Sequence, residues 1–253
     1  MAKLVWNNAA GFSLALLNVS NLNDGTSDSA TPTSYSVAYS SGERDVFGGY
    51  GFTYDAKGVP SGGVVTSYTG FFGPTALGSI EGLSIAVPVL VQAVSTASTE
   101  DDLAIFSSAL SGDDVIIGNR GSDILEGFAG NDRITGGLKG DLLHGGAGAD
   151  RFVFTSVKDS RTTKEGLDLI LDFSLRQKDK LDLMAIDANT KKAGNQAFKF
   201  IGTSDFHKTP GELRYEKAKG YTLVEGDVNG DGKADFSVLL KGGLNFTKGY
   251  FYL

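Results

Sequence analysis

The chain contains no cysteine, so its 253 residues can form neither disulfide bonds nor thiolate metal sites. Histidine is almost absent as well, because only His144 and His207 occur. A zinc protease of the H-E-x-x-H type needs two histidines one helical turn apart and a glutamate base, and neither histidine has that context. The Gly-x-Ser-x-Gly motif of hydrolases is also missing. The sequence therefore shows no recognisable catalytic group, and a non-catalytic role is favoured.

Long apolar runs and excess positive charge are missing too. No stretch approaches the roughly 20 apolar residues of a membrane-spanning helix. The net charge of −7 and the pI of about 4.9 argue against a nucleic-acid partner, which requires a basic face. The apolar stretch 9–17 is interrupted at its front by Asn7 and Asn8, and no small-residue cleavage pattern follows it. A cleaved secretory signal peptide is therefore not expected.

Glycine, in contrast, is abundant, and much of it lies in a repeat from Ala109 to Val153. The repeat has five consecutive nine-residue units, ALSGDDVII, GNRGSDILE, GFAGNDRIT, GGLKGDLLH and GGAGADRFV. The sixth position is always aspartate: Asp114, Asp123, Asp132, Asp141 and Asp150. The eighth position is always bulky and apolar: Ile116, Leu125, Ile134, Leu143 and Phe152. The fourth position is glycine in four units and Lys139 in the other.

This pattern predicts calcium binding. We expect each unit to form a tight turn and a short strand, with the apolar eighth residue pointing into a core. Glycine adopts the positive φ of such turns at little cost, and the turn presents backbone carbonyls beside the aspartates. Carboxylates and carbonyls form the oxygen shell that Ca²⁺ prefers, with about six to eight ligands. Ordinary hairpin turns explain one unit, but not an aspartate in constant phase through five.

Two units make one full coil, so turns on the same edge recur every eighteen residues. This spacing pairs Asp132 with Asp114 and with Asp150 on one edge, and Asp123 with Asp141 on the other. The predicted aspartate ligands are Asp114, Asp123, Asp132, Asp141 and Asp150, together with Asp159, which continues the register beyond Asp141. The predicted turn glycines are Gly112, Gly121, Gly127, Gly130, Gly136 and Gly145. We expect this ligand set to hold about three to four ions.

A second candidate calcium loop lies at residues 227–235. Its side-chain ligands would be Asp227, Asn229, Asp231 and Asp235, in the D-x-N-x-D-G spacing that opens an EF-hand loop. The bidentate glutamate of that loop is replaced by Val238. The segment is therefore either a shorter calcium loop closed by Asp235 or a calcium-free Asx turn.

The region before the repeat has a different pattern. Alternating residues predict strands at 35–39, 47–54 and 64–68, and the apolar spacing within 83–110 predicts two short helices. Thr99 is the expected N-cap of the second helix. The aromatic residues of this region form either the core of a small β domain, which is the preferred interpretation, or a sugar-stacking face: Phe47, Tyr50, Phe52, Tyr54, Tyr68, Phe71 and Phe72.

The repeat resembles the G-G-x-G-x-D-x-U-x nonapeptide of RTX calcium-binding proteins. The segments GGAGADRFVF, DLILDF, DKLDLMAIDAN, QAFKFIGT, GELRYE and GDVNGDGKADF are similar to the C-terminal region of serralysin-type secreted metalloproteases. The resemblance covers residues 111–253, and the zinc motif of the protease is missing from the sequence. It implies a parallel β-roll followed by a β-sandwich, bound calcium and export by a type I secretion system. The tail KGYFYL has the hydrophobic residues of such an export signal but not its acidic residue.

We therefore predict a mainly β protein with two domains. Residues 1–108 form a small β-rich domain with two short helices, and residues 109–253 form the β-roll and an antiparallel β-sandwich. The predicted function is a secreted, extracellular calcium-binding protein that folds on meeting calcium and binds polysaccharide or a cell surface. The alternatives are a secreted enzyme or a hemophore-like carrier with its activity in residues 1–108, where Tyr50 or Tyr68 would bind iron.

Overall fold

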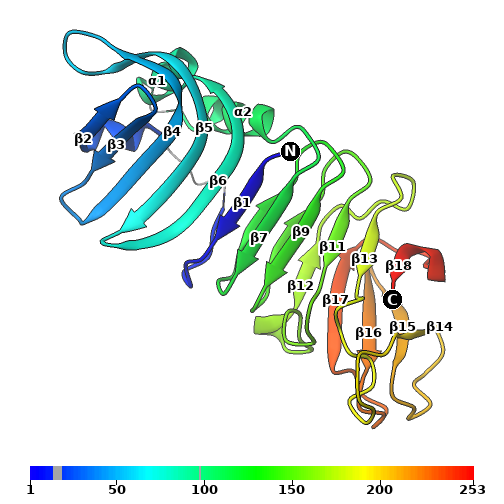
Figure 1. Ribbon diagram of the computed structural model, residues 1–253. Coiled ribbons are helices and arrows are strands. Elements are labelled where there is room, and N and C mark those ends of the chain that lie inside the picture. The colour runs from blue at the N-terminus through cyan, green and yellow to red at the C-terminus, as the bar shows by residue number, and fades with distance from the viewer. Residues whose placement is uncertain (14–18, 97) are drawn as a thin grey trace. The chain divides into compact units, whose positions relative to one another are not determined.

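A computed structural model describes residues 1–13, 19–96 and 98–253 (Figure 1). The chain folds into two compact units. The first contains residues 1–8 and 13–115, and the second contains residues 9–12 and 116–253. Part of the apolar stretch 9–17 lies outside the described residues. No helix in the described ranges is both long and apolar enough to cross a membrane.

The first unit is built on an antiparallel sheet in the order β1-β6-β5-β4-β3-β2. Its strands are β1 (Lys3–Trp6), β2 (Thr26–Thr31), β3 (Ser34–Ala38), β4 (Glu43–Tyr54), β5 (Pro60–Phe72) and β6 (Thr75–Ala86). The three strands predicted from alternation correspond to β3, β4 and β5. Gly51 and Gly63 adopt positive φ where β4 and β5 bulge, which helps these strands to bend around α1 (Figure 1).

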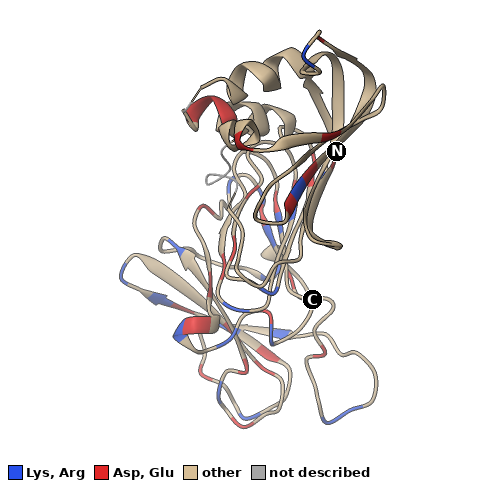
Figure 2. Ribbon diagram, turned by 90° about the vertical axis from the view of Figure 1, so that its left-hand side faces the viewer, with Lys and Arg blue, Asp and Glu red and all other residues tan. Residues whose placement is uncertain are grey.

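Two α-helices follow β6, as predicted: α1 (Val87–Val94) and α2 (Glu100–Ala109). A 3-10 helix, η2 (Val19–Asp24), lies earlier in the chain. Thr99 is at the N-cap of α2, although its side chain makes no capping hydrogen bond, and the first turn of α2 is acidic (Figure 2). The predicted helical region began at residue 83, but strand β6 continues to Ala86. Ile85 is a buried residue of β6, because it continues the strand alternation of Leu83.

The aromatic residues of the first unit divide between core and surface. Phe47 and Phe52 are buried, with 8% and 5% of their surface exposed. Tyr50 and Phe72 are exposed at 60% and 55%. The core interpretation therefore holds for the first pair, while the second pair is accessible to a partner.

The second unit is a two-sheet roll. One sheet contains β7 (Val115–Asn119), β9 (Arg133–Gly137), β11 (Arg151–Val153), β13 (Lys180–Asp182) and β18 (Phe251–Tyr252). The other contains β8 (Ile124–Glu126), β10 (Leu142–His144), β12 (Asp168–Ile170), β17 (Phe236–Lys241), β16 (Tyr221–Asp227), β15 (Glu212–Ala218) and β14 (Lys199–Gly202). Short 3-10 helices are η3 (Lys164–Gly166) and η4 (Lys248–Tyr250).

The core of the roll is the ladder of eighth-position residues. All five are at most 1% exposed: Ile116, Leu125, Ile134, Leu143 and Phe152. Burying one such side chain stabilises a fold by about 1.5–3 kcal/mol, so the ladder is the main apolar contribution to the repeat region. The prediction that the eighth position points inward is confirmed.

The mainly β fold, with a roll followed by an antiparallel section, is confirmed. However, the roll is longer than its five repeats. Strands β12 and β13, expected in the antiparallel section, pair in parallel with β10 and β11. The antiparallel section is formed by β15, β16 and β17. Parallel pairing continues because β12 and β13 keep a buried apolar residue, Ile170 and Leu181, in register with Leu143 and Phe152.

Neighbouring leucines of β10 provide a test of this core. Leu143 is 1% exposed, whereas Leu142 is 37% exposed. We expect Leu143→Ala to lower the free energy of unfolding in calcium by about 2–5 kcal/mol, because it leaves a cavity. Leu142→Ala is the matched control and should change it by about 0.5 kcal/mol or less. Urea unfolding followed by circular dichroism measures both. Equal losses would mean that the roll does not bury alternate residues as described.

Candidate metal centre

The sixth-position aspartates are buried along two edges of the roll and are connected by hydrogen bonds. On one edge, the backbone N–H of Asp123 donates to Oδ1 of Asp141 at 2.8 Å. The N–H of Asp141 then donates to Oδ1 of Asp168 at 3.0 Å. The side chains of all three residues are at most 1% exposed. We call this row the Asp141 ladder.

The opposite edge repeats the arrangement. The N–H of Asp132 donates to Oδ1 of Asp150, and the N–H of Asp150 donates to Oδ1 of Asp179, both at 3.0 Å. We call this row the Asp150 ladder. Each ladder thus brings together one pair expected from the eighteen-residue spacing, Asp123 with Asp141 and Asp132 with Asp150.

The second carboxylate oxygen has a different environment from the first. In the described chain, Oδ2 of four ladder residues is buried and accepts no hydrogen bond: Asp123, Asp141, Asp150 and Asp168. A Cβ built on Gly136 would lie 2.2 Å from Oδ2 of Asp141, and one on Gly145 would lie 2.3 Å from Oδ2 of Asp150. The space beside these oxygens therefore exists only because Gly136 and Gly145, the first residues of their repeat units, have no side chain.

Backbone carbonyls lie in the same space. A Cβ on Gly118 would lie 2.1 Å from the carbonyl oxygen of Gly136 and 2.4 Å from Oδ2 of Asp123. A Cβ on Gly127 would lie 2.5 Å from the carbonyl oxygen of Gly145 and 2.4 Å from Oδ2 of Asp132. Carboxylate and carbonyl oxygens of adjacent coils thus converge beside each glycine. This donor set fits Ca²⁺, which takes oxygen ligands of both kinds.

Side chains alone do not complete such a site. The described residues contain no group of three or more His, Cys, Asp or Glu side chains that could hold a metal ion. Since a Ca²⁺ ion needs about six to eight oxygen ligands, the carbonyls of the turns must supply much of its shell. The carbonyl oxygens of the predicted turn glycines Gly136 and Gly145 lie beside these carboxylates and could contribute.

Burial makes the ladder carboxylates reluctant to ionise. It raises the pKa of Asp123 to about 6 and that of Asp141 to about 7. Burial also raises the pKa of Asp168 to about 9, and the negative charge of Asp141 adds to this increase. On the other ladder, burial raises the pKa of Asp179 to about 6. A cation beside these groups would oppose the shifts.

The eighteen-residue register predicted Asp159 as the next residue of the Asp141 ladder, but Asp168 takes that place. The negative charge of Asp159 still adds to the raised pKa of Asp141 and of Asp168, and its role as a calcium ligand remains a prediction. Oδ2 of Asp159 accepts hydrogen bonds from the backbone N–H of Thr155 and of Ser156, at 2.7 and 3.1 Å. Residues between β11 and β12 form an inserted loop that moves the register, so Asp168 takes the place. The ladder then ends, because the N–H of Asp168 donates to Oγ of Ser160 at 2.9 Å and that hydroxyl donates to the carbonyl of Ser237.

The sequence prediction missed Asp168, Asp179 and Gly118. The first two carry a signal that could have found them, because each stands two residues before a buried apolar residue, as in the repeat. These apolar residues are Ile170 and Leu181. Gly118 opens the unit that contains Asp123 and is equivalent to Gly127.

The remaining predicted ligands have the following positions. Asp114 lies in the first compact unit of the chain, where it is buried and accepts a hydrogen bond from the backbone N–H of Ala2. Gly112 is exposed and Gly121 is buried. Gly130 has a φ of 132°, as expected for a turn glycine. The calcium-binding roles of these residues remain predictions.

Lys139 occupies the strained position that its place in the repeat implied. Its φ is 77°, in the left-handed region that costs a non-glycine residue about 1–2 kcal/mol. Its ammonium lies 3.4 Å from the carbonyl oxygen of Ala9, and its charge partly offsets the increase in the pKa of Asp123. Phe128 also adopts the left-handed conformation, with a φ of 66°, and no pattern in the sequence predicted it.

The loop at 227–235 is held by its own hydrogen bonds. Asp227 accepts the backbone N–H of Gly230 at Oδ1 and that of Gly232 at Oδ2. Oδ2 of Asp235 accepts the N–H of Val228 and of Asn229. Oδ1 of Asp231 accepts the N–H of Lys233. The contact of Asp231 is that of an Asx turn, whereas Asp227 and Asp235 hold the loop from its two ends. Calcium binding by this loop remains a prediction.

The histidines lie outside both ladders. Nε2 of His144 is 3.3 Å from Oδ2 of Asp172, and Nδ1 of His207 is 2.9 Å from Oε1 of Glu212. Their side chains are 44% and 63% exposed, as expected for surface residues.

Comparisons with known proteins place this arrangement in a family. The family model described as Peptidase M10 serralysin C terminal matches residues 75–251. No curated protein sequence matches at a significant level. Among solved structures, the AlgE6R3 and AlgE6R2 subunits of the Azotobacter vinelandii mannuronan C5-epimerase are 26% and 27% identical, each with a TM-score of 0.40. Each alignment covers 56% of this chain, and 74% and 89% of those chains.

The extracellular lipase LipA from Serratia marcescens is 18% identical with a TM-score of 0.29, over 56% of this chain and 20% of the lipase. Among these comparisons, the family model alone spans well over half of the sequence. The chain therefore belongs to the Peptidase M10 serralysin C-terminal family, and this membership implies that its β-roll binds calcium.

Proposed function

We propose that this protein is secreted, and that extracellular calcium drives the folding of its roll. The observation that carries the proposal is the pair of ladders. Buried carboxylates such as Asp141 and Asp150 have one oxygen without a hydrogen-bond donor, and a glycine-lined space lies beside it. Calcium supplies the positive charge that such a space requires. Without it, the burial of these carboxylates opposes folding.

The same chemistry links folding to location. Cytosolic calcium is low, so the self-repelling chain, with its net charge of −7, stays unfolded and competent for export. Outside the cell, an ion that binds only the folded roll stabilises it by about 2.7 kcal/mol per site at a hundredfold excess over Kd. The summed stabilisation from several such sites is as large as the free energy of unfolding of a typical domain, which is about 5–15 kcal/mol. Proteins of this family are exported by type I systems, and we assign the same route to this chain.

For the first unit we propose a non-catalytic binding role, directed at polysaccharide or a cell surface. Support comes from the exposed rings of Tyr50 and Phe72 on the curved sheet. A hemophore-like role through Tyr68 is less favoured, because its hydroxyl already donates a hydrogen bond to Asp45 at 2.7 Å. Tyr50 is free of that restriction but is exposed at 60%, which suits surface contact better than an enclosed iron site.

Calcium removal tests the folding proposal directly. Circular dichroism of the full chain in a chelator should show a partial loss of strand signal, because the roll in residues 116–253 unfolds. Millimolar calcium should restore the signal. The matched control is magnesium at the same concentration, which prefers a smaller, octahedral shell and should not restore the signal. An unchanged spectrum in the chelator would contradict calcium-driven folding.

The raised pKa values predict how the calcium-free chain responds to pH. Unfolded aspartate has a pKa of about 3.9, so the folded roll binds more protons than the unfolded chain between that value and the raised values of Asp141 and Asp168. Stability in the absence of calcium therefore falls as pH rises through this window. Calcium-stripped protein should gain strand signal when the pH is lowered from about 8 to about 6.

The double variant Asp141→Asn/Asp168→Asn serves as the control for this pH effect. It cannot bear the two buried charges, so its calcium-free form should keep more strand signal at about pH 8 and respond less to pH. If the parent instead gains structure as the pH rises, the ladder is not what destabilises the calcium-free roll.

We expect Lys139 to weaken calcium binding at the Asp141 ladder. The variant Lys139→Gly removes both the left-handed strain and a positive charge beside Asp123. We expect tighter calcium binding by isothermal titration and a higher unfolding midpoint at limiting calcium. Lys139→Met keeps the strain without the charge, so the two variants separate the causes. Phe128→Gly is the comparison for strain alone. Lys139→Gly binding no more tightly than the parent would refute the expectation.

A further inference from the structure

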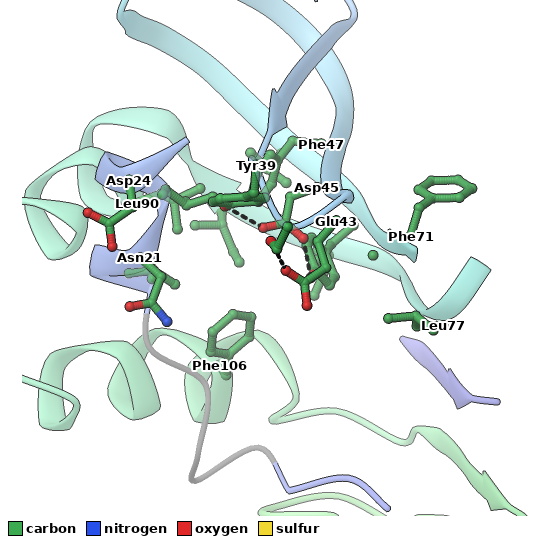
Figure 3. Close-up of a pocket in the computed structure, with 18 of the residues that line it drawn as sticks. Asn21, Asp24, Tyr39, Glu43, Asp45, Phe47, Phe71, Leu77, Leu90 and Phe106 are labelled. Carbon is green, nitrogen blue, oxygen red and sulfur yellow. Dashed lines mark hydrogen bonds between the residues drawn. The ribbon is translucent and has the colours of Figure 1, made fainter. Parts of the chain in front are cut away.

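A cleft of about 510 Å³ lies within the first unit (Figure 3). Its walls come from strands β1, β4, β5 and β6, the 3-10 helix η2 and the helices α1 and α2. The volume falls within the range of about 300–1,000 Å³ that is typical of small-molecule sites. The calcium proposal makes no use of this cleft.

One wall of the cleft presents a fixed carboxylate. Oδ1 of Asp45 accepts a hydrogen bond from the hydroxyl of Tyr68, and Oδ2 accepts one from the hydroxyl of Tyr39, both at 2.7 Å. Glu43 lies next to Asp45 in Figure 3. The two tyrosines hold Asp45 in one orientation, while each of its oxygens keeps a further lone pair for a ligand.

The polar part of the cleft is negative. Asp24, Glu43 and Asp45 line it, and none of its described lining residues is Lys, Arg or His. Burial raises the pKa of the Tyr39 hydroxyl, and all three carboxylates add to the increase. Arg44 is not a lining residue, and its guanidinium lies over the ring of Phe71, 5.0 Å from the ring centre.

Apart from Asn21, Ser40 and Ser41, most of the remaining lining is apolar. In Figure 3 the ring of Phe106, from α2, lies across the cleft from Glu43 and Asp45, and Leu90 of α1 lies beside Tyr39. Phe47 and Val65 continue this lining. A bare metal ion would make no use of such a surface. An organic molecule with a positive group and an apolar body would contact both parts.

We propose that the cleft binds a small organic ammonium cation. The positive group lies against Asp45 and Glu43, and the apolar body lies against Leu90 and Phe106. The ring of Tyr39 adds a cation–π contact, a kind of contact that is worth about 0.5–2 kcal/mol. This inference rests on the binding role proposed for the first unit, names its ligand class, and is independent of calcium binding by the roll.

Trp6 makes the proposal measurable, because it lines the cleft and is the single tryptophan of the chain. Fluorescence titration of the full chain in calcium would use hexyltrimethylammonium as the probe. The neutral isostere 2,2-dimethyloctane and the anion hexanoate are the matched ligands. We expect the cation to bind at least about tenfold more tightly than either, and added salt to weaken its binding.

Variants then locate the binding. Asp45→Asn keeps the shape of the side chain and removes its charge, and we expect it to weaken binding about tenfold. Glu43→Gln, at a more exposed position that holds no tyrosine, should weaken it by a smaller factor. Asp55→Asn is the control, because Asp55 carries the same charge on a turn of the same unit but does not line the cleft. Thermal unfolding of each variant separates lost binding from lost folding.

The proposal is overturned if the cation binds no better than its neutral isostere, or if folded Asp45→Asn and Glu43→Gln both bind it as tightly as the parent. Binding of neutral oligosaccharides without binding of the cation would also overturn it, while supporting the broader binding role of the first unit. Failure of calcium to restore the strand signal would count against the folding proposal alone.

Discussion

A carboxylate that is buried with only one of its oxygens hydrogen-bonded is the constraint on which the roll depends. Water cannot reach it, and a neighbouring coil provides one N–H donor to Oδ1 but none to Oδ2. Such a group is costly when ionised unless a cation is present, and its raised pKa expresses that cost. The roll repeats this arrangement on both edges, so the cost is distributed along the whole repeat. The apolar ladder inside the roll is therefore necessary for the fold but does not remove the need for positive charge.

The glycines and aspartates of the repeat depend on each other in this structure. A side chain on Gly136 or Gly145 would occupy the space in front of the facing carboxylate oxygen. In the four repeat units that begin with glycine, this glycine is thus required for space beside the oxygen, in addition to the backbone freedom that is usually assigned to repeat glycines. Lys139 shows the opposite situation, because its fourth position tolerates a side chain at the cost of backbone strain.

The features of the structure that could be predicted from the sequence are those that follow from the nine-residue period. The inward eighth residues such as Leu125, and the pairing of Asp123 with Asp141, follow from counting by nine and by eighteen. Counting fails at the loop between β11 and β12, which is why Asp159 was expected in the place that Asp168 takes. The cleft was beyond prediction for a different reason. Asp45 meets Tyr68 through the register of β4 with β5, and that register includes bulges that no local pattern encodes.

Ser160 gives the Asp141 ladder an end. At this point a neutral hydroxyl receives the N–H of Asp168, and its own proton is directed to the carbonyl of Ser237. A row of carboxylates linked in this way is open-ended in principle, since each coil presents the same groups to the next. Ser160 ends the row because its hydroxyl accepts the N–H of Asp168 and carries no negative charge. Ser160 therefore determines where this row of carboxylates stops, separately from the number of repeats in the sequence.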